Sequence, residues 1–402
     1  MKRPMRGLVT SSLVLLSLTG SASADTPDKG DYIAQAKVLW RIAACGGTDE
    51  AAPAKFDTKT IERHCKSMTE LYAAHKKRWA DKAKQFIGEV RPKDAPKTVV
   101  YPFGGGDLSS ALVAFPDATE ITTISLEAAG DARLIDSIRM GTLSGDLGEV
   151  SSHIRNLYAS AYSATMNLQK ASRDSSFPGT LMMVFAGMAL HDMEPVSFRY
   201  FDVLPDGNVA YLSAAELESR ATEYIATKRG KTPPKKITHY WYAHDSAFGN
   251  VEIQFRPRGD AKAPLRTYRH IVQNLDDTHL KADDRVLQHL RKKGKVSMMT
   301  KAASFLLWYD DFTAIRSYLL GNLAWMVSDA SGIPPSYAGP AGYEQMTYGE
   351  FTGPLFTIDP KNTRKEFIKL WKEQPKRPLA FRFGYPDVNK KPHLLVTRPK
   401  TP

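Results

Sequence analysis

Apolar residues recur at helical spacing over residues 31–90, and charged residues fill the opposite face of the pattern. A period of 3.6 residues is typical of amphipathic helices that bury one side. The pattern predicts two helices, over residues 32–44 and 58–86. Pro92 and Pro96 follow the second helix and end this helical region.

The pattern then changes to that of a β-strand. Residues 98–103 form a short run rich in β-branched and aromatic side chains, followed directly by three glycines and Asp107. A short helix is expected over residues 108–115, and a second strand over residues 120–126 ends at Glu127. Strand, glycine turn, helix and strand in this order are typical of the first unit of a parallel α/β sheet.

The rest of the chain alternates between helical and strand-like segments. Pro205, Asp206 and Gly207 predict a hairpin turn. Further helices are expected over residues 131–193, 283–293 and, as a pair, 301–328. Further strands are expected over residues 196–203, 208–212, 237–243, 251–256, 265–273, 296–300, 378–385 and 393–398.

These elements predict an α/β fold with a Rossmann-like mixed sheet and helices on both faces. A helical N-terminal segment precedes the sheet, and a C-terminal strand hairpin ends it. The predicted regions are a signal peptide over residues 1–24, the helical segment over 25–96, and the α/β domain over 97–402. An antiparallel insertion is expected around residues 196–273.

The extreme N-terminus has the order of a cleavable signal peptide. Lys2 and Arg3 precede an apolar run over residues 7–19, and a small-residue tripeptide ends at Ala24. Cleavage is expected after Ala24, which predicts a periplasmic or secreted protein. No later segment is apolar over the about 20 residues that a membrane-spanning helix needs, so no transmembrane segment is expected in the mature chain.

The chain has two cysteines, Cys45 and Cys65. An even pair in an exported protein predicts a disulfide, which here would join the two N-terminal helices. Two cysteines alone are a poor metal site, and His64 beside them does not complete a ligand set. No metal is therefore expected.

The formal net charge of +12 is spread along the chain. Basic exported proteins often contact anionic envelope components, whereas an ordinary solvated basic face is the alternative interpretation. No basic stripe interleaved with aromatic residues is present, so nucleic acid is not an expected partner.

The glycine turn is the first candidate ligand site. Gly104, Gly105 and Gly106 let a ligand approach the main chain closely, and Asp107 opens the following helix. Glu127, about 20 residues later, is placed to accept hydrogen bonds from a diol. The alternative is a tight turn that serves only the fold, with Asp107 as helix N-cap.

Two further residues are candidates for the same edge of the sheet. Lys301 follows a predicted strand and is placed to reach a phosphate or carboxylate, and Asp329 is a candidate for lining a cleft. Their alternatives are a solvated lysine and a helix terminus. His239 and His244 are five residues apart on a predicted strand, so they point to opposite faces and do not predict joint metal ligation.

Part of the chain resembles a family of exported bacterial proteins that has no assigned activity. The matching segments, scattered over residues 99–390, are Tyr101-Pro102-Phe103-x-Gly105-x-Asp107, Phe115-Pro116-x-Ala118, Leu126-Glu127, Lys301-x-Ala303-Ser304-x-Leu306, Ser331-Gly332-Ile333-Pro334 and Tyr348-Gly349. The glycine turn, Glu127 and the C-terminal hairpin also distantly resemble the Rossmann-like methyltransferase superfamily. That superfamily usually has an acidic residue before its glycines, where this chain has Tyr101, Pro102 and Phe103.

Neither resemblance implies a reaction or a particular cofactor. The sequence favours a binding protein, or degenerate transferase scaffold, that holds a small polar ligand at the carboxyl edge of the sheet. An active envelope transferase or hydrolase and a purely structural envelope protein are the alternatives. No Gly-x-Ser-x-Gly elbow, His-Glu-x-x-His helix or Walker loop is present.

Overall fold

The computed structural model describes residues 30–49, 52–138, 140–160, 177–220, 248–353, 364–384 and 391–400. The predicted signal peptide with its cleavage after Ala24 lies outside the described residues. The predicted strand 237–243, with His239 and His244, also lies outside them.

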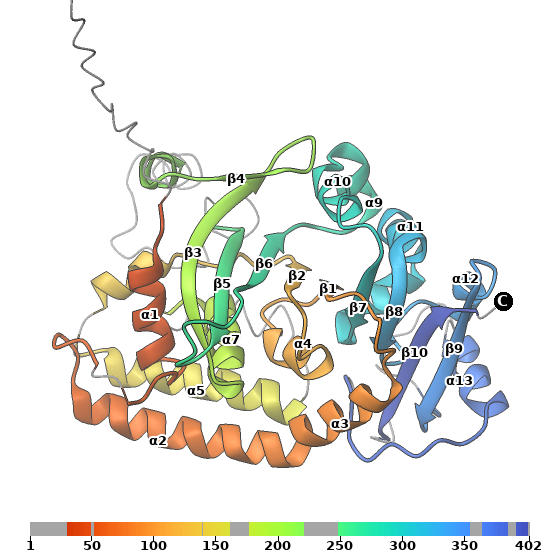
Figure 1. Ribbon diagram of the computed structural model, residues 1–402, viewed down its shortest axis with the longest axis horizontal. Helices are drawn as coiled ribbons and strands as arrows, with labels where there is room; N and C mark the ends of the chain where they lie inside the picture. The colour runs from red at the N-terminus through yellow and green to blue at the C-terminus, as the bar shows by residue number, and fades with distance from the viewer. Residues whose placement is uncertain are drawn as a thin grey trace, which may run out of the picture.

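The described residues form one ten-stranded sheet (Figure 1). Its strands are β1 (Thr98–Pro102), β2 (Glu120–Ser125), β3 (Met193–Val203), β4 (Val209–Tyr211), β5 (Val251–Pro257), β6 (Arg266–Val272), β7 (Val296–Thr300), β8 (Leu323–Ser328), β9 (Tyr343–Gly349) and β10 (His393–Pro399). Their order in the sheet is β4-β3-β5-β6-β2-β1-β7-β8-β10-β9. The five central strands, from β6 to β8, are parallel, and antiparallel strands extend the sheet at both sides. The predicted mixed α/β sheet is confirmed.

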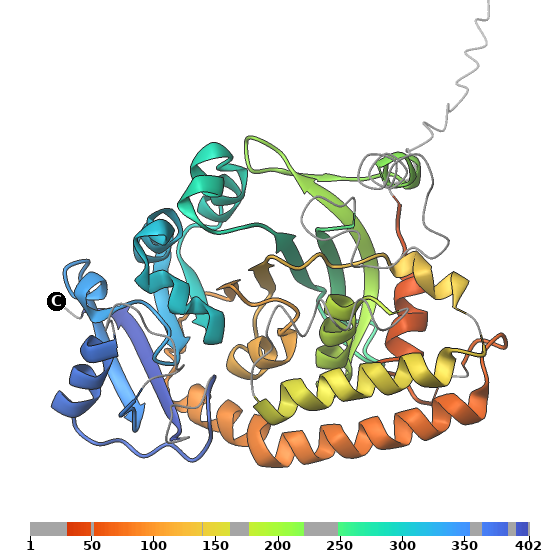
Figure 2. The same cartoon turned by 180° about the vertical axis from the view of Figure 1, so that it is seen from behind.

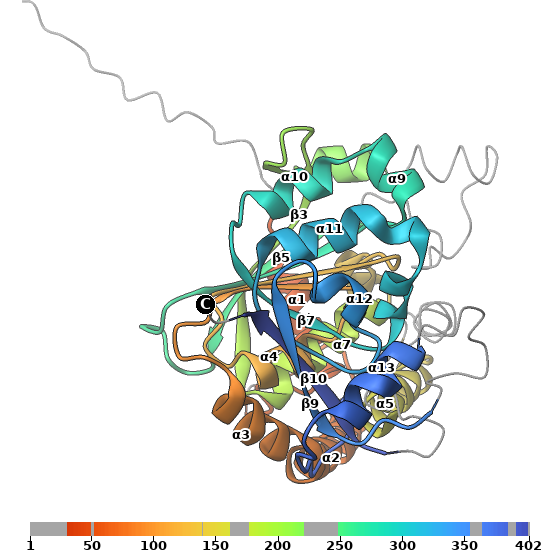
Figure 3. The ribbon, with the colours of Figure 1, turned by 90° about the vertical axis from the view of Figure 1, so that its right-hand side faces the viewer.

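Helices cover both faces of this sheet. They are α1 (Ile33–Ile42), α2 (Thr58–His75), α3 (Asp81–Val90), α4 (Leu108–Ala114), α5 (Leu143–Ser160), α7 (Gly179–Leu190), α9 (Asp277–Ala282), α10 (Arg285–Arg291), α11 (Thr313–Asn322), α12 (Pro335–Ala338) and α13 (Arg364–Glu373). Figure 3 shows α9, α10 and α11 on one side of the molecule and α2, α3 and α5 on the other. Val99 packs into one hydrophobic core and its neighbour Val100 into the other, as side chains that alternate across a buried strand must.

The helical N-terminal segment is also confirmed. Asp57 caps α2 by accepting a hydrogen bond from the Thr60 amide. One π-helical turn, Lys76–Ala80, joins α2 to α3, so the two helices run on almost without a break along one side of the molecule. Figure 2 shows α5 lying along α2.

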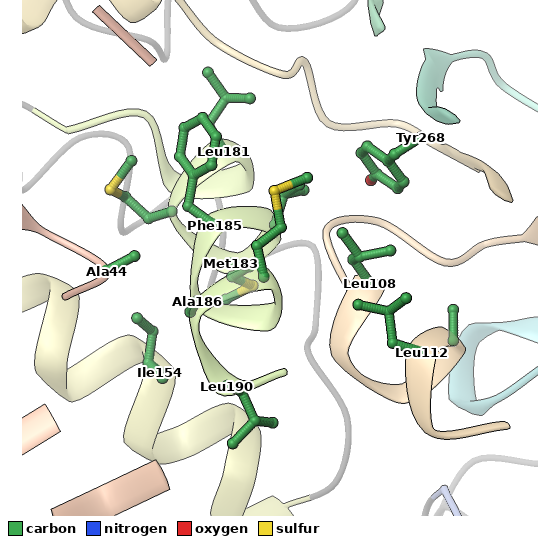
Figure 4. Close-up of a cluster of buried hydrophobic side chains, with 14 of the residues drawn as sticks. Ala44, Leu108, Leu112, Ile154, Leu181, Met183, Phe185, Ala186, Leu190 and Tyr268 are labelled. Carbon is green, nitrogen blue, oxygen red and sulfur yellow. The ribbon is translucent and has the colours of Figure 1, made fainter. Parts of the chain in front are cut away.

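Helix α7 is the centre of the core on this side of the sheet (Figure 4). All of its residues except Ala189 are buried, which is expected of a helix that is apolar on every side. It packs against α4 and the glycine turn, where Gly187 lies so close to Ser109 that an added Cβ would be 2.8 Å from the Ser109 amide nitrogen. A methyl group at residue 187 would therefore push α7 away from the first turn of α4.

The disulfide between Cys45 and Cys65 is confirmed, with a Cα–Cα distance of 5.2 Å. It joins the residues that follow α1 to α2. His64 beside it is held by the protein, since its Nε2 lies 2.8 Å from the Ala43 carbonyl oxygen and its Nδ1 lies 3.0 Å from Ser151 Oγ. Among the described residues, no helix is both long and apolar enough to cross a membrane.

Three predicted elements need correction. The pair of helices expected over residues 301–328 is wrong in its second half, because residues 323–328 form strand β8. Before it lie two short 3-10 helices, η4 (Ala302–Trp308) and η5 (Asp310–Phe312), and α11. A short apolar run fits a buried strand as well as a helix, so periodicity alone does not separate them.

The other two corrections concern strand pairing. The C-terminal hairpin is present, but β10 pairs with β9, whereas residues 378–384 form no strand. The segment 265–273, expected within an antiparallel meander, forms β6, which is antiparallel to β5 but parallel to β2 and so completes the parallel centre. Pairing partners depend on contacts far apart in the sequence, which local patterns do not contain.

Candidate functional site

The candidate residues all follow central parallel strands. The glycine turn follows β1, Glu127 follows β2, Lys301 follows β7 and Asp329 follows β8. Because these strands are parallel, their carboxyl ends lie at one edge of the sheet. Ligands of open α/β sheets bind at this edge.

Asp107 and Lys301 form a buried ion pair between the ends of β1 and β7. Lys301 Nζ lies 2.9 Å from Asp107 Oδ2 and also donates to Ser110 Oγ at 2.8 Å. Asp107 accepts from the Ser110 amide, which confirms it as the N-cap of α4, and from the Tyr101 hydroxyl at 3.1 Å. The Lys301 and Asp107 side chains are only 2% and 7% exposed. The polar groups of both side chains are therefore used in bonds within the protein and are not exposed to a ligand.

Asp329 is also bound by the protein's own chain. Its carboxylate accepts from the amide and hydroxyl of Ser331, and from the Ala302 amide at 3.4 Å. Gly384 lies directly against it, since a Cβ at residue 384 would be 2.0 Å from Asp329 Oδ2. Asp329 thus holds together the loops after β7 and β8.

Glu127 differs from the other candidates because its carboxylate is unmatched. The residue is 7% exposed, and no hydrogen bond or ion pair of the described residues uses its carboxylate oxygens, which still contact solvent. Its backbone is firmly held, because its amide donates to Ser125 Oγ at 3.3 Å and its carbonyl accepts from His270 Nε2 at 2.7 Å. A carboxylate that is largely sheltered and has no donor from the chain is available to accept hydrogen bonds from a ligand.

A buried hydrogen-bond chain ends at the main-chain carbonyl of Glu127. Burial lowers the pKa of His270, an effect partly offset by the Glu127 carbonyl and charge, so the imidazole is neutral at neutral pH. With Nε2 donating to Glu127, Nδ1 accepts from the Thr123 hydroxyl at 3.2 Å. The Tyr268 hydroxyl lies 2.8 Å from Thr123 Oγ1, where either oxygen can be the donor, and 3.4 Å from the Gly105 carbonyl oxygen.

The sequence analysis missed the residues of this chain, Thr123, Tyr268 and His270. The only indication in the sequence is that polar side chains stand inside otherwise apolar strands. Such residues are common at solvated strand faces, so they do not predict a buried network before the parallel pairing of β2 and β6 is known.

Some main-chain amides of the glycine turn have hydrogen-bond acceptors within the protein, and others have none. The Gly104 amide donates to Ile124, and the Asp107 and Leu108 amides donate within the turn. The amides of Gly105 and Gly106 have no acceptor in the part of the chain that the structure describes. The amides around the start of α4 are thus largely used, and the two glycine amides remain.

Each glycine in the turn has a steric reason. A Cβ at Gly104 would lie 2.7 Å from the Tyr101 ring, and one at Gly106 would lie 2.7 Å from the Thr180 carbonyl oxygen on α7. Gly105 has a φ of +51°, which favours glycine. Phe103 and Ala302, in the turns after β1 and β7, also have positive φ values, of 60° and 54°. Non-glycine residues in this conformation are strained and concentrate at functional sites.

Aromatic rings from the N-terminal and C-terminal parts of the chain lie beside the Asp107–Lys301 pair. Lys301 Nζ lies 5.7 Å from the ring centroids of both Trp79 and Phe383. Trp79 Nε1 donates to the Arg382 carbonyl at 2.6 Å, which ties the N-terminal segment to the C-terminal part of the chain. Trp79 and Phe383 lie outside the motifs named in the sequence analysis, so those motifs gave no indication of these contacts.

Comparisons with known proteins give no evidence for the function, which therefore has to be inferred from the geometry of the site. No family model matches the sequence. No curated protein and no solved structure shows significant similarity to it.

Proposed function

We propose that the protein binds a small polar ligand at the carboxyl edge of β1 and β2, on a scaffold like that of a degenerate transferase. One observation carries the proposal: unmatched groups of opposite hydrogen-bonding character lie at the ends of adjacent strands. Glu127 offers acceptors without donors, while Gly105 and Gly106 offer donors without acceptors. Folded proteins rarely leave buried main-chain amides unpaired, and the Glu127 oxygens are accessible beside them.

These groups define the chemistry of the ligand. A carboxylate accepts hydrogen bonds, so it suits a molecule with hydroxyl donors, such as the diol of a sugar or nucleoside. The glycine amides suit an acceptor on the same molecule, such as a carbonyl, carboxylate or phosphate oxygen. A polyhydroxylated ligand with one acceptor-rich end satisfies both sets.

The topology supports this placement. The chain continues from β1 to β2 on one side, and β7 lies on the other side, so the strand order reverses at β1. Ligands of doubly wound sheets bind beside such a reversal. Antiparallel β10, inserted between β8 and β9, also resembles the end of the Rossmann-like methyltransferase fold.

The burial and pairing of Asp107 and Lys301 favour a binding function over a catalytic one. A transferase or hydrolase that used Asp107 or Lys301 would need that side chain to reach its substrate, but each is buried and bonded to the other. A purely structural role would leave the unmatched Glu127 carboxylate unexplained, because it stabilises nothing within the described chain.

Glu127→Gln is expected to abolish ligand binding without weakening the fold. It removes a buried charge that has no partner, so the free protein should unfold at the same or a higher temperature. A bound ligand at 100 times its dissociation constant should stabilise the wild type by about 2.7 kcal/mol and the variant by much less. Thermal unfolding with nucleosides, S-adenosyl compounds, sugars and cell-wall fragments measures both effects.

Glu89→Gln is the matched control, because Glu89 is exposed on α3. It should leave both the fold and the ligand shift unchanged. The proposal fails if none of these compounds stabilises the wild type, or if Glu127→Gln keeps the full shift.

We further propose that the protein is exported and contacts an anionic envelope component. The disulfide fits an oxidising compartment. Lys76, Lys77, Lys82 and Lys84 are exposed around the π-helical turn, and no ion pair with a described residue neutralises them. All four lie within nine residues of one another, where α2 continues into α3.

Changing these four lysines to glutamine is expected to weaken binding to vesicles of anionic phospholipid by about 1 kcal/mol per lysine. Vesicle sedimentation at low and high salt measures the loss, and a soluble phosphate polymer tests a non-lipid source of the same charge. The matched control carries glutamine at four exposed lysines of the α13 region, Lys365, Lys369, Lys372 and Lys376. Equal losses in both variants would show a non-specific charge effect.

A further inference from the structure

A small cavity with both polar and apolar lining lies beside the Asp107–Lys301 pair, between the first turn of α4, the end of α2 and the end of α5. Three buried side chains that line it have polar atoms without a hydrogen-bond partner. These atoms are His75 Nδ1, Ser109 Oγ and Tyr158 Oη. They come from three different helices, and their residues are 3%, 2% and 4% exposed.

The three groups are held toward the cavity by packing. The rings of His75 and Tyr158 are stacked, with centroids 4.0 Å apart and planes 12° from parallel. Burial raises the pKa of Tyr158, and Ser109 partly offsets this effect, which places the two hydroxyls near one another. The two hydroxyls are nevertheless not oriented to form a regular hydrogen bond with each other.

The charges around the cavity are already balanced. Lys301 is paired with Asp107, and two of its three N–H groups are taken by Asp107 and Ser110. Burial lowers the pKa of His75 to about 4, with the nearby Arg78 and Lys301 charges adding to the effect. The imidazole is therefore neutral at neutral pH, and the cavity offers hydrogen bonds without a net charge to attract an ion.

We propose that this cavity is a binding site for one neutral, hydrogen-bonding molecule of the size of water, held jointly by His75, Ser109 and Tyr158. The space admits a single water molecule, and a buried water needs two to four polar partners, which these groups supply. In the isolated protein the occupant is water. It links the N-terminal helices to the turn that carries Asp107, independently of the ligand proposed at Glu127.

A crystal structure of the mature chain tests the site directly. The expected result is a density peak in the cavity within hydrogen-bonding distance of at least two of the three atoms. An empty cavity overturns the proposal, and so does a direct hydrogen bond between Ser109 and Tyr158 with no third molecule.

The sign of a stability change tests the site in solution. If a water molecule is hydrogen-bonded to the Tyr158 hydroxyl, Tyr158→Phe removes that hydrogen bond. The equilibrium constant for folding should then fall roughly fivefold. Ser109→Ala should act in the same direction. If the cavity is dry, both substitutions remove an unsatisfied buried group, and folding should be unchanged or more favourable.

Thr122→Val is the matched control for a dry site. Thr122 Oγ1 is buried and unpartnered like the three cavity atoms, but it does not line the cavity. Its removal should leave stability unchanged or higher. Loss of stability in Tyr158→Phe and Ser109→Ala, with none in Thr122→Val, supports the proposal, whereas the same behaviour in all three variants overturns it.

Discussion

Lys301→Met is expected to lower the free energy of unfolding by about 3–5 kcal/mol. The substitution leaves the Asp107 carboxylate buried at 7% side-chain exposure without its cation. Removing one partner of a buried ion pair is strongly destabilising, because the remaining charge keeps its desolvation penalty and loses its compensation. Equilibrium unfolding in urea measures the change.

A matched surface pair separates burial from pairing. Lys281 bonds to Asp277 at 3.0 Å, nearly the same distance, but its side chain is 66% exposed. Lys281→Met should therefore lose less than about 1 kcal/mol. Similar losses for the two lysine variants would mean that Lys301 stabilises the fold no more than a surface charge does.

The double variant Asp107→Asn with Lys301→Met is the second control. It removes both charges, so it should recover part of the stability lost in the single variant. Recovery will be incomplete, because Asp107 also caps α4 and accepts the Tyr101 hydroxyl. If the double variant is less stable than the sum of the single changes predicts, the two side chains do not act as a pair.

Replacing Cys45 and Cys65 together by alanine is expected to lower the free energy of unfolding by about 3 kcal/mol. The disulfide closes a loop across a sequence separation of 20 residues. In the chain-entropy model, the lost bond lets the unfolded chain gain conformational freedom of this size. Urea unfolding of the variant and the oxidised wild type measures the difference.

The native contact between the two helices should survive this change. Tyr72 donates to the Ala44 carbonyl at 2.7 Å, and His64 bonds to the Ala43 carbonyl oxygen, both independently of the sulfur atoms. We therefore expect a native circular dichroism spectrum with lower stability. A reducing agent should destabilise the wild type to the same extent and leave the alanine variant unchanged. No response of the wild type to reduction would contradict the stabilising role.

The sequence determined the features that depend on neighbouring residues. The glycine turn, the N-cap at Asp107 and the hairpin turn at 205–207 are local, because backbone freedom and capping act within about four residues. The helical N-terminal segment followed from periodicity, and the Cys45–Cys65 bond followed from the presence of only two cysteines. These predictions needed no knowledge of the sheet.

Only the tertiary structure decided which of the candidate groups are free to bind anything. Lys301 and Asp107 are 194 residues apart, and they pair because β7 lies beside β1. Asp329 is occupied by Ser331 and covered at Gly384, while Glu127 is left unmatched. A sequence pattern names the side chain, but its partners come from strands and loops that meet only when the chain is folded. The unmatched carboxylate, on which the proposed function depends, is a property of the assembled sheet edge.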